Sequence, residues 1–515
     1  MAGATISGLM LKRGGLAVLS GVLLALSFPS FNLAPLAFGA LVPLLIALEG
    51  MPSLQATYLG IIAGLIFSLT SIPWVIHTMT TYGGLSFSLS FLLFMALSLY
   101  LALYTGVFAY GVNRFFSSGS LAYLLGAPTL WVALEYLRTF LLTGFPWNLL
   151  GYSQHQNLPV IQVASVTGVY GISFLLVLTN AAMALSCLRL RLGWRRALLP
   201  VLGVGVFFGG TVLFGMGRMV SAETRREDIR VLVVQGNIEQ TLKWDPKFQD
   251  QTIEIYRRLT EQASGESDLI VWPETAVPLF LREKGPLSER IFRLAPEVRS
   301  HLLVGSPDRT SGISPRYYNS AFLISPVGEI VQKYDKIHLV PFGEYVPLKS
   351  LLFFVHKMAA GIGDFSPGQA LTVFETPQGR FGVLICFEAI FPDQVRRYVL
   401  EGADFLVNIT NDAWFGNSSA PHQHLSMATL RAVENGVYLV RAANTGISAL
   451  IAPTGQIVKQ SDLFVETVLS GRIALGSAGT FYTRHGDLFA WGCSVISVLL
   501  LASRRRRGWS QGGNP

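Results

Sequence analysis

Three side chains that could carry out acyl transfer lie in one polar stretch of the sequence: Glu274, Lys336 and Cys386. A thiol becomes a nucleophile when a nearby carboxylate removes its proton. A fixed ammonium then stabilises the oxyanion that forms when the sulfur attacks a carbonyl. Because these residue types are common, the three alone do not distinguish a thioester-forming enzyme from surface charges and a buried core cysteine.

Each of these residues follows a segment that we expect to end near it. Pro273 stops the apolar run that precedes Glu274, and Cys386 closes the apolar run 382–386. Lys336 lies on a segment bounded by Pro and Gly residues that also carries Glu344. In α/β folds, the carboxyl ends of buried strands are where chemistry is placed.

Glu388 lies two residues after Cys386. Residues i and i+2 leave a strand on the same face. If the strand continues past Cys386, we therefore expect the thiol and this second carboxylate to share one pocket.

The polar stretch alternates short apolar runs with helical patterns, which is typical of an α/β domain. The strands that we expect are 230–235, 268–272, 301–305, 321–324, 382–386, 403–409, 437–442 and 448–451. The helices that we expect include 248–263, 392–401 and 424–435.

The charge distribution divides the chain into two kinds of sequence. Residues 1–218 and 486–515 hold 13 basic and 3 acidic side chains, whereas residues 219–485 hold 26 basic and 28 acidic ones. The basic excess behind the net charge of +8 therefore lies in the apolar flanks. A nucleic-acid-binding protein would carry its excess on a folded polar face, so we expect no nucleic-acid partner.

The flanks contain runs apolar enough to form about eight transmembrane helices. These runs are 15–28, 37–48, 54–76, 85–112, 121–142, 161–188, 197–216 and 488–502. The first resembles the apolar part of a signal peptide, but no small-residue cleavage site stands out after it. We interpret it as a retained helix.

Basic residues beside these runs predict one membrane orientation. Lys12 and Arg13 place the N-terminus in the cytoplasm, and counting crossings from there puts Arg114, the arginines at 189–196 and those at 504–507 on the same side. The polar domain between the seventh and eighth runs must then face away from the cytoplasm. Inside the flanks, Glu135 and Arg138 are three residues apart, and we favour an ion pair between them over a lipid-headgroup contact.

Several strings around the candidate residues resemble the nitrilase superfamily of carbon–nitrogen hydrolases. They are Trp-Pro-Glu at 272–274, Lys-Ile-His-Leu-Val-Pro-Phe-Gly-Glu at 336–344, Ile-Cys-Phe-Glu at 385–388 and Asn-Asp-Ala-Trp-Phe-Gly at 411–416. Together with the apolar flanks, they resemble its membrane-embedded branch, the apolipoprotein N-acyltransferases. Lys-Trp-Asp at 243–245 and Thr-Gly-Phe-Pro-Trp at 143–147 are also similar to that family.

The resemblance implies a fold and a set of roles. The fold is a polytopic helical membrane domain with a nitrilase-like αββα sandwich. Residues 1–218 would form a membrane domain of seven transmembrane helices, 219–485 the extracytoplasmic catalytic domain, and 486–515 the eighth helix with a basic cytoplasmic tail. The implied roles are general base for Glu274, oxyanion stabiliser for Lys336, nucleophile for Cys386, accessory groups for Glu344 and Glu388, and substrate-binding positions for Trp244, Phe387 and Trp414.

Phe387 stands where family members can have a Tyr after the nucleophile, so a hydroxyl there is dispensable or only the ring matters. The implied reaction moves an acyl chain from the sn-1 position of phosphatidylethanolamine to Cys386. The chain then passes to the N-terminal amine of a diacylated apolipoprotein. The implied location is the bacterial inner membrane, with the catalytic domain in the periplasm. No metal or other cofactor is expected, and His422 and His424 are assigned capping or core roles. The sequence is silent on oligomeric state.

Two other functions are open at this stage. A membrane-tethered amidase would share the three catalytic residues but pass the acyl group to water. A lipid-binding or transport protein would have no use for Cys386. The apolar segment 351–355 is either a short core element or a mobile arm that touches lipid and gates substrate access.

Overall fold

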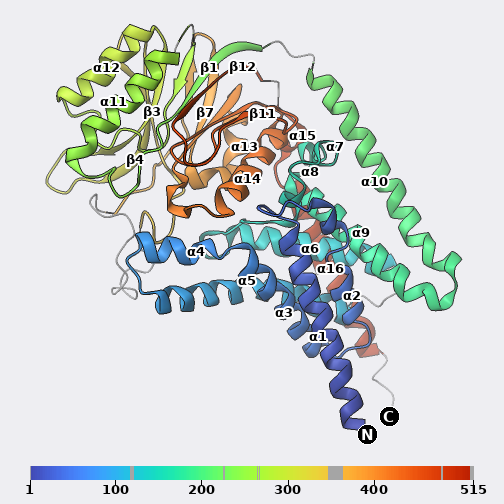
Figure 1. Ribbon diagram of the computed structural model, residues 1–515. Helices are drawn as coiled ribbons and strands as arrows, with labels where there is room; N and C mark the ends of the chain where they lie inside the picture. Colours follow the sequence, from blue (N-terminus) through green and yellow to red (C-terminus); the bar gives the residue numbers. More distant parts are fainter. Residues whose placement is uncertain are drawn as a thin grey trace. The chain divides into compact units, whose positions relative to one another are not determined.

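The computed structural model describes residues 2–115, 121–223, 227–263, 265, 267–345, 364–476 and 479–510, which form two compact units. The first contains Met1–Pro73, Phe91–Met219 and His485–Pro515, and the second contains Trp74–Ser90 and Val220–Arg484. Figure 1 shows that the first unit is helical and that the second contains the β-sheets. The segment 74–90 thus belongs to the α/β unit although it connects two apolar helices.

The helical unit is built from long apolar helices with short ones between them. They are α1 (Ala2–Leu26), η1 (Ala34–Phe38), α2 (Val42–Ala47), α3 (Ser53–Ser71), α5 (Phe87–Phe115), α6 (Leu121–Phe140), η3 (Leu141–Thr143), η4 (Leu150–Gln154), α7 (Leu158–Ile161), α8 (Ala164–Thr167), α9 (Val169–Arg189), η5 (Leu190–Leu192), α10 (Trp194–Glu223) and α16 (Leu488–Ser510).

Five helices in the described part of the chain are long and apolar enough to cross a membrane. They comprise 8–26, 53–71, 87–115, 169–192 and 194–221. The apolar segments 34–47, 158–167 and 488–502 are shorter. The expected apolar helical part is therefore confirmed, while the number of eight transmembrane helices stays a prediction.

Two of the expected helices are interrupted. The run 54–76 ends as a helix at Ser71, and Trp74–His77 (α4) and the π-helix Thr78–Tyr82 (η2) follow as separate elements. The helix breaks at Pro73, because proline lacks the N–H that would continue the helix and restricts the conformation of the residue before it. The run 161–188 breaks at Gly168, whose φ of +65° no right-handed helix contains.

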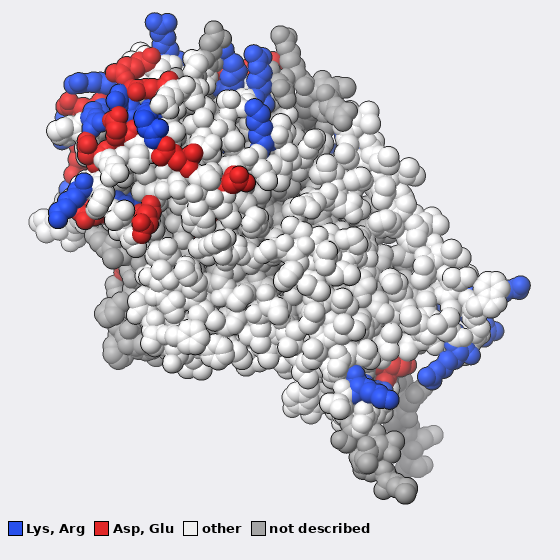
Figure 2. Space-filling view, viewed as in Figure 1, with Lys and Arg blue, Asp and Glu red and all other residues white. Residues whose placement is uncertain are grey.

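Apolar side chains cover the outer surface of the long helices. On α10, for example, Val206 is 78% exposed and Leu213 is 71% exposed. In Figure 2 the acidic and basic side chains gather over the α/β unit, whereas the helical surface is almost free of them. Such a surface is stable in hydrocarbon rather than in water, so this is a membrane protein.

The α/β unit contains two six-stranded sheets. The first has the order β12-β1-β2-β3-β4-β5 and the second β11-β10-β9-β8-β7-β6. Their bounds are β1 Glu227–Gln235, β2 Leu269–Val271, β3 His301–Arg309, β4 Tyr317–Ile324, β5 Ile330–Asp335, β6 Val373–Thr376, β7 Gly379–Ile385, β8 Phe405–Thr410, β9 Leu439–Ala443, β10 Ala449–Ile451, β11 Ile457–Gln460 and β12 Thr467–Ala474. The neighbours β1, β2 and β3 are parallel, as are β7, β8 and β9.

Alternating side chains of β1 show how the layers form. Val231 and Val233 pack into a core shared with the second sheet, whereas Leu232 and Val234 pack against α11 (Pro246–Ala263) and α12 (Pro286–Val298). On the second sheet, α13 (Pro392–Leu400) and α14 (Ala420–Asn435) contribute to the shared core cluster. The expected αββα sandwich is confirmed (Figure 1).

All eight expected strands and all three expected helices of this unit are present, with ends shifted by a few residues. The strands β5, β6, β11 and β12 and the helix α12 were not predicted. The missed β11 shows why, since three of its four residues are exposed and it carries no apolar run.

Candidate active site

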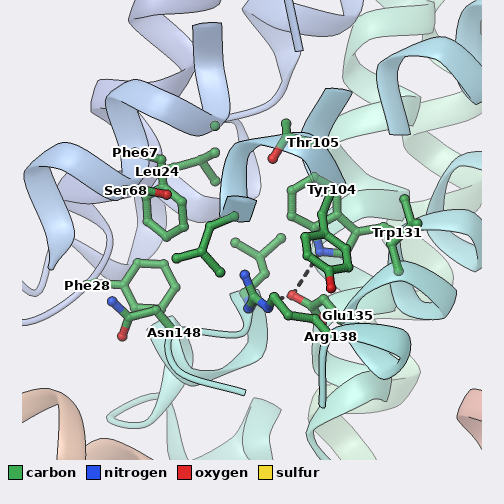
Figure 3. Close-up of a pocket in the computed structure, with 14 residues that line it drawn as sticks. Leu24, Phe28, Phe67, Ser68, Tyr104, Thr105, Trp131, Glu135, Arg138 and Asn148 are labelled. Carbon is green, nitrogen blue, oxygen red and sulfur yellow. Dashed lines mark hydrogen bonds between the residues drawn. The ribbon is translucent and has the colours of Figure 1, made fainter. Parts of the chain in front are cut away.

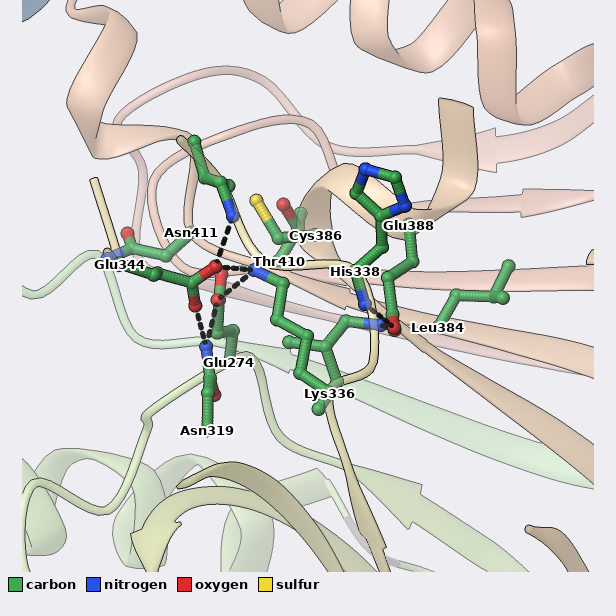
Figure 4. Close-up of polar contacts among 12 residues, drawn as sticks. Glu274, Asn319, Lys336, His338, Glu344, Leu384, Cys386, Glu388, Thr410 and Asn411 are labelled. Carbon is green, nitrogen blue, oxygen red and sulfur yellow. Dashed lines mark hydrogen bonds and ion pairs between the residues drawn. The ribbon is translucent and has the colours of Figure 1, made fainter. Parts of the chain in front are cut away.

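The three expected catalytic residues come together from the ends of strands in both sheets (Figure 4). Glu274 follows β2 and Lys336 follows β5 in the first sheet, and Cys386 follows β7 in the second. Lys336 Nζ lies 3.5 Å from Glu274 Oε1, and the charges of both residues act on the Cys386 thiol. The structure thus assembles a carboxylate, an ammonium and a thiol that are up to 112 positions apart in the sequence.

The carboxylate of Glu274 has one bound oxygen and one unbound oxygen. Oε1 accepts a 2.7 Å hydrogen bond from Asn319 Nδ2 and faces Lys336. Oε2 is buried and has no hydrogen-bond partner among the residues that the structure describes. A buried carboxylate oxygen without a partner is suited to accept a proton from a neighbouring group.

Asn319 lies on β4 and connects the two carboxylates, although sequence reasoning missed it. Its Nδ2 donates to Glu274 Oε1 at 2.7 Å and to Glu344 Oε1 at 2.8 Å. The available signal was an asparagine inside a strand, where this residue type is uncommon. It holds two like charges near one ammonium.

The Lys336 ammonium is 1% exposed and is held by Glu344 Oε2 at 2.9 Å. Burial acts to lower the pKa of Lys336, but the carboxylates of Glu344 and Glu274 outweigh it and raise that pKa above its ordinary value. The side chain is therefore a permanent cation. A fixed cation beside a nucleophile is what the oxyanion of an acyl-transfer reaction requires.

Cys386 begins a tight turn rather than continuing the strand. Its φ is +52°, and residues 386–390 form the 3-10 helix η6. Burial raises the pKa of the Cys386 thiol, the Glu274 carboxylate raises it further, and the Lys336 ammonium opposes both. The resting thiol is therefore neutral, so its deprotonation has to accompany attack.

This turn also corrects the expectation for Glu388, because the strand does not continue. Glu388 Oε1 accepts hydrogen bonds from Tyr334 Oη at 2.7 Å and from the N–H of Ile337 at 2.8 Å, and Oε2 accepts one from Ile385 N at 2.8 Å. These bonds connect the segment after Lys336 to the turn that begins at Cys386. Glu388 is thus placed to position the site and not to share its pocket with the thiol.

Comparison with known proteins agrees with this architecture. The carbon–nitrogen hydrolase family matches residues 230–482, and the N-terminal domain of apolipoprotein N-acyltransferase matches residues 20–182. The apolipoprotein N-acyltransferase of Geobacter metallireducens is 48% identical over 96% of this chain and 95% of its own. The chain belongs to the apolipoprotein N-acyltransferase family.

Another relative covers nearly the whole chain, and a solved structure covers about half of it. The apolipoprotein N-acyltransferase of Azotobacter vinelandii is 37% identical over 96% of this chain and 95% of its own. A solved structure of Saccharomyces cerevisiae Nit3, a member of branch 10 of the nitrilase superfamily, aligns with 48% of this chain and 91% of its own, at 20% identity and a TM-score of 0.39.

In this member of the apolipoprotein N-acyltransferase family, a buried charged network contacts the main chain of Cys386. His424 Nε2 lies 3.2 Å from the main-chain oxygen of Cys386, and His424 Nδ1 lies 3.0 Å from Asp412 Oδ1. Asp412 Oδ2 accepts from Arg441 Nη2 at 2.7 Å. His424 therefore has a structural role in the core, as expected, and Asp412 joins it to Arg441.

The three expected substrate-binding residues lie in different surroundings. Trp244 lines a pocket of about 480 Å³ together with Pro278, Phe280 and Tyr317. Phe387 is half-buried and contacts the rings of His338 and Phe391. Trp414 is half-buried, and its ring packs edge-on against Tyr82.

Through Tyr82 and other residues, the segment 74–90 supports the loop 411–416 of this family member. Tyr82 Oη donates to the main-chain oxygen of Ala413 at 3.1 Å, and Thr78 Oγ1 donates to that of Trp414 at 3.0 Å. Trp74 Nε1 donates to Gln423 Oε1 at 3.2 Å. Sequence reasoning missed this role, because the segment overlaps the ends of two apolar runs that were expected to be transmembrane helices.

The expected ion pair between Glu135 and Arg138 is not a direct contact, although the two buried charges attract each other. Glu135 Oε1 accepts from Trp131 Nε1 at 2.9 Å and from Leu150 N at 2.7 Å, and Arg138 Nη2 donates to the main-chain oxygen of Trp147 at 3.2 Å. In the described chain, no ion pair within 4.0 Å joins the two charges. They line a cavity of about 40 Å³ in the helical unit, beside Asn148 (Figure 3). The expected arm at 351–355 lies outside the described residues.

Proposed function

We propose that this protein is a phospholipid:apolipoprotein N-acyltransferase that carries the acyl chain as a thioester on Cys386. The observation that supports this most directly is the buried cluster of Glu274, Lys336 and the thiol, in a chain that matches both halves of the family. The donor is a membrane phospholipid, acting through the sn-1 ester of phosphatidylethanolamine. The acceptor is the N-terminal amine of a diacylglyceryl-cysteine.

The first step forms the thioester. Glu274 takes the proton of the Cys386 thiol while the sulfur attacks the ester carbonyl, and the Lys336 ammonium stabilises the oxyanion. The carbon–oxygen bond to glycerol then breaks. Glu274 returns the proton to the glycerol oxygen, and the lysophospholipid leaves.

The second step forms the amide. The acceptor nitrogen attacks the thioester carbonyl, Glu274 takes a proton from that nitrogen, and the carbon–sulfur bond breaks. The proton then returns to the sulfur of Cys386. Every transfer uses side chains of the chain itself, so the proposed mechanism needs no cofactor. Water must be excluded from the thioester, because hydrolysis would make the enzyme a phospholipase.

The accessory residues have proposed roles that follow from their contacts. Glu344 holds the Lys336 ammonium, and Glu388 holds the turn of the nucleophile against the segment after Lys336. Trp244, Phe387 and Trp414 line or shape the site that binds the substrates.

We also propose the arrangement of the chain in the membrane. Residues 1–218 provide seven transmembrane helices, residues 219–485 the periplasmic catalytic domain, and residues 486–515 the eighth helix and a cytoplasmic tail. The arginines at 189–196 and 504–507 and the pair Lys12 and Arg13 support this topology through the positive-inside rule. Both substrates lie in the inner membrane, so attachment keeps the catalytic domain beside them.

Acceptor use tests the proposal. The purified protein is incubated in phosphatidylethanolamine nanodiscs with a diacylated lipopeptide whose N-terminus is either free or acetylated. We expect equal amounts of lysophospholipid and N-acylated peptide with the free amine, and no peptide product with the acetylated one. Continuous release of free fatty acid in both samples would instead indicate a hydrolase.

A further inference from the structure

Lys243 is a fully buried lysine that the proposed mechanism does not use. It lies between β1 and α11, next to Trp244, and its side chain has no solvent exposure. Its Nζ donates a 3.1 Å hydrogen bond to the main-chain oxygen of Glu274. A cation thus points at the backbone of the residue that carries the proposed base.

The charge of Lys243 has no direct ion-pair partner among the described residues. In the described part of the chain, no carboxylate oxygen lies within 4.0 Å of Lys243 Nζ. Burial lowers the pKa of Lys243 to about 7, and the Glu274 carboxylate opposes that shift. A hydrocarbon side chain of the same length would fill the space without the cost of burying a charge. A destabilising group beside the proposed base is better explained by function than by stability.

The backbone that Lys243 holds is tightly confined. Thr275, the next residue, has a φ of +47°, a backbone angle that residues other than glycine rarely adopt. On the β3 side, a Cβ added to Gly305 would lie 2.4 Å from the oxygen of Pro273 and 2.7 Å from the Cα of Glu274. Close packing against β3 and the hydrogen bond from Lys243 together fix the main chain of Glu274.

We propose that Lys243 is a positioning residue for Glu274: its hydrogen bond fixes the main-chain oxygen of the residue that carries the proposed base. This inference rests on the proposed function, in which Glu274 takes the proton of Cys386. Among the described residues, the other charged or titratable groups near the Glu274 carboxylate are Lys336, Glu344 and Cys386. Lys243 therefore adds a second cation to a site that brings two carboxylates together.

Lys243→Met tests the proposal, and Lys247→Met, at an exposed position of α11, is the matched control. Two rates are measured in the full-length protein in nanodiscs as a function of pH: acylation of Cys386 by phosphatidylethanolamine and alkylation of Cys386 by iodoacetamide. We expect Lys243→Met to lower both rates by about 10- to 100-fold and to shift their pH profiles, because the variant removes a buried group whose own pKa is about 7 from beside Glu274. We expect Lys247→Met to behave like the wild type.

The outcomes separate this proposal from the proposed function. Unchanged rates in a folded Lys243→Met protein would overturn the positioning role. A loss by the same factor at every pH would also overturn it, since defective packing alone has that effect. If alkylation shows the expected shift but the wild type forms no acyl-enzyme, the positioning role stands and the proposed function fails. Thermal unfolding and Lys243→Arg, which keeps a donor and a charge, identify a variant that fails only because it does not fold.

Discussion

Lys336 Nζ lies closer to Glu344 Oε2, at 2.9 Å, than to Glu274 Oε1, at 3.5 Å. The accessory carboxylate is therefore the main partner of the buried ammonium. In the described part of the chain Oε2 of Glu274 has no hydrogen-bond partner, so the proposed base retains an oxygen that can take a proton. The relationship explains why two carboxylates accompany Lys336.

Glu344→Gln should slow thioester formation while leaving the fold intact. The amide is similar in size but removes the charge that holds Lys336, so Glu274 becomes the only carboxylate beside the ammonium. We expect the rate of Cys386 acylation to fall by about 10- to 100-fold, within the range observed when electrostatic stabilisation is disturbed. Quench-flow measurement with a fluorescent phospholipid checks this. Glu329→Gln, an exposed glutamate, is the control, and equal rates in the two variants would contradict the role of Glu344.

Glu388→Gln should destabilise the α/β unit. The carboxylate accepts hydrogen bonds from Ile337 N and Ile385 N, among others, and the NH₂ of an amide cannot replace both oxygens as acceptors. We expect a loss of about 2–4 kcal/mol in the free energy of unfolding, together with lower activity. Thermal unfolding in detergent measures the first effect. The exposed Glu375→Gln should change stability by less than about 0.5 kcal/mol, and a similar shift in both variants would be evidence against the role of Glu388.

Acid should weaken the network behind the nucleophile through Asp412. Burial acts to raise the pKa of this carboxyl, but Arg441 and His424 outweigh it and hold the pKa at about 2, below its ordinary 3.8. A depressed carboxyl pKa adds stability above pH 3.8 that is lost as the pH falls toward 2. We expect this loss to be about 2 kcal/mol.

Unfolding of Asp412→Asn checks this contribution. The variant should be less stable than the wild type at neutral pH, because Arg441 loses its buried partner, and the difference should shrink below pH 3.8. The exposed Asp462→Asn is the control. A difference that stays constant across this range would exclude the assigned pKa shift.

Removal of the Lys243 charge should raise stability, and the gain should depend on pH. The pKa of Lys243 falls from an ordinary 10.5 to about 7 in the folded protein, so the unfolded chain holds the proton more tightly. Burial of the charge therefore destabilises the wild type fully below pH 7, and this effect fades as the pH rises to 10.5. The thermal midpoint of Lys243→Met should exceed that of the wild type, and the difference should be larger at neutral pH than at alkaline pH. A lower midpoint at every pH would show that the lysine stabilises the fold.

The two kinds of structure in the chain could be predicted from the sequence because each has a distinct composition. Apolar runs with few charges mark the helices of the membrane part. Buried strands such as β2 and β7 contain continuous apolar runs, so Glu274 and Cys386 could be placed at strand ends. The helix breaks at Pro73 and Gly168 were missed, because the runs remain apolar on both sides.

The rest of the site depends on tertiary contacts that no local pattern records. Asn319 reaches the two carboxylates from β4, and Tyr82 reaches Ala413 from a segment 331 residues away. The turn at Cys386 has a positive φ that the sequence does not indicate, and it determines where Glu388 points. Lys243 resembles a surface lysine until its burial is known.

The central claim is that Cys386 carries an acyl chain. Mass spectrometry of the peptide containing Cys386, after incubation of the purified protein with phosphatidylethanolamine, tests it most directly. The proposed mechanism predicts a mass increase of one acyl chain that disappears when a diacylated lipopeptide with a free amine is added, and no increase in Cys386→Ser. An unmodified peptide together with a fully active Cys386→Ser protein would contradict it.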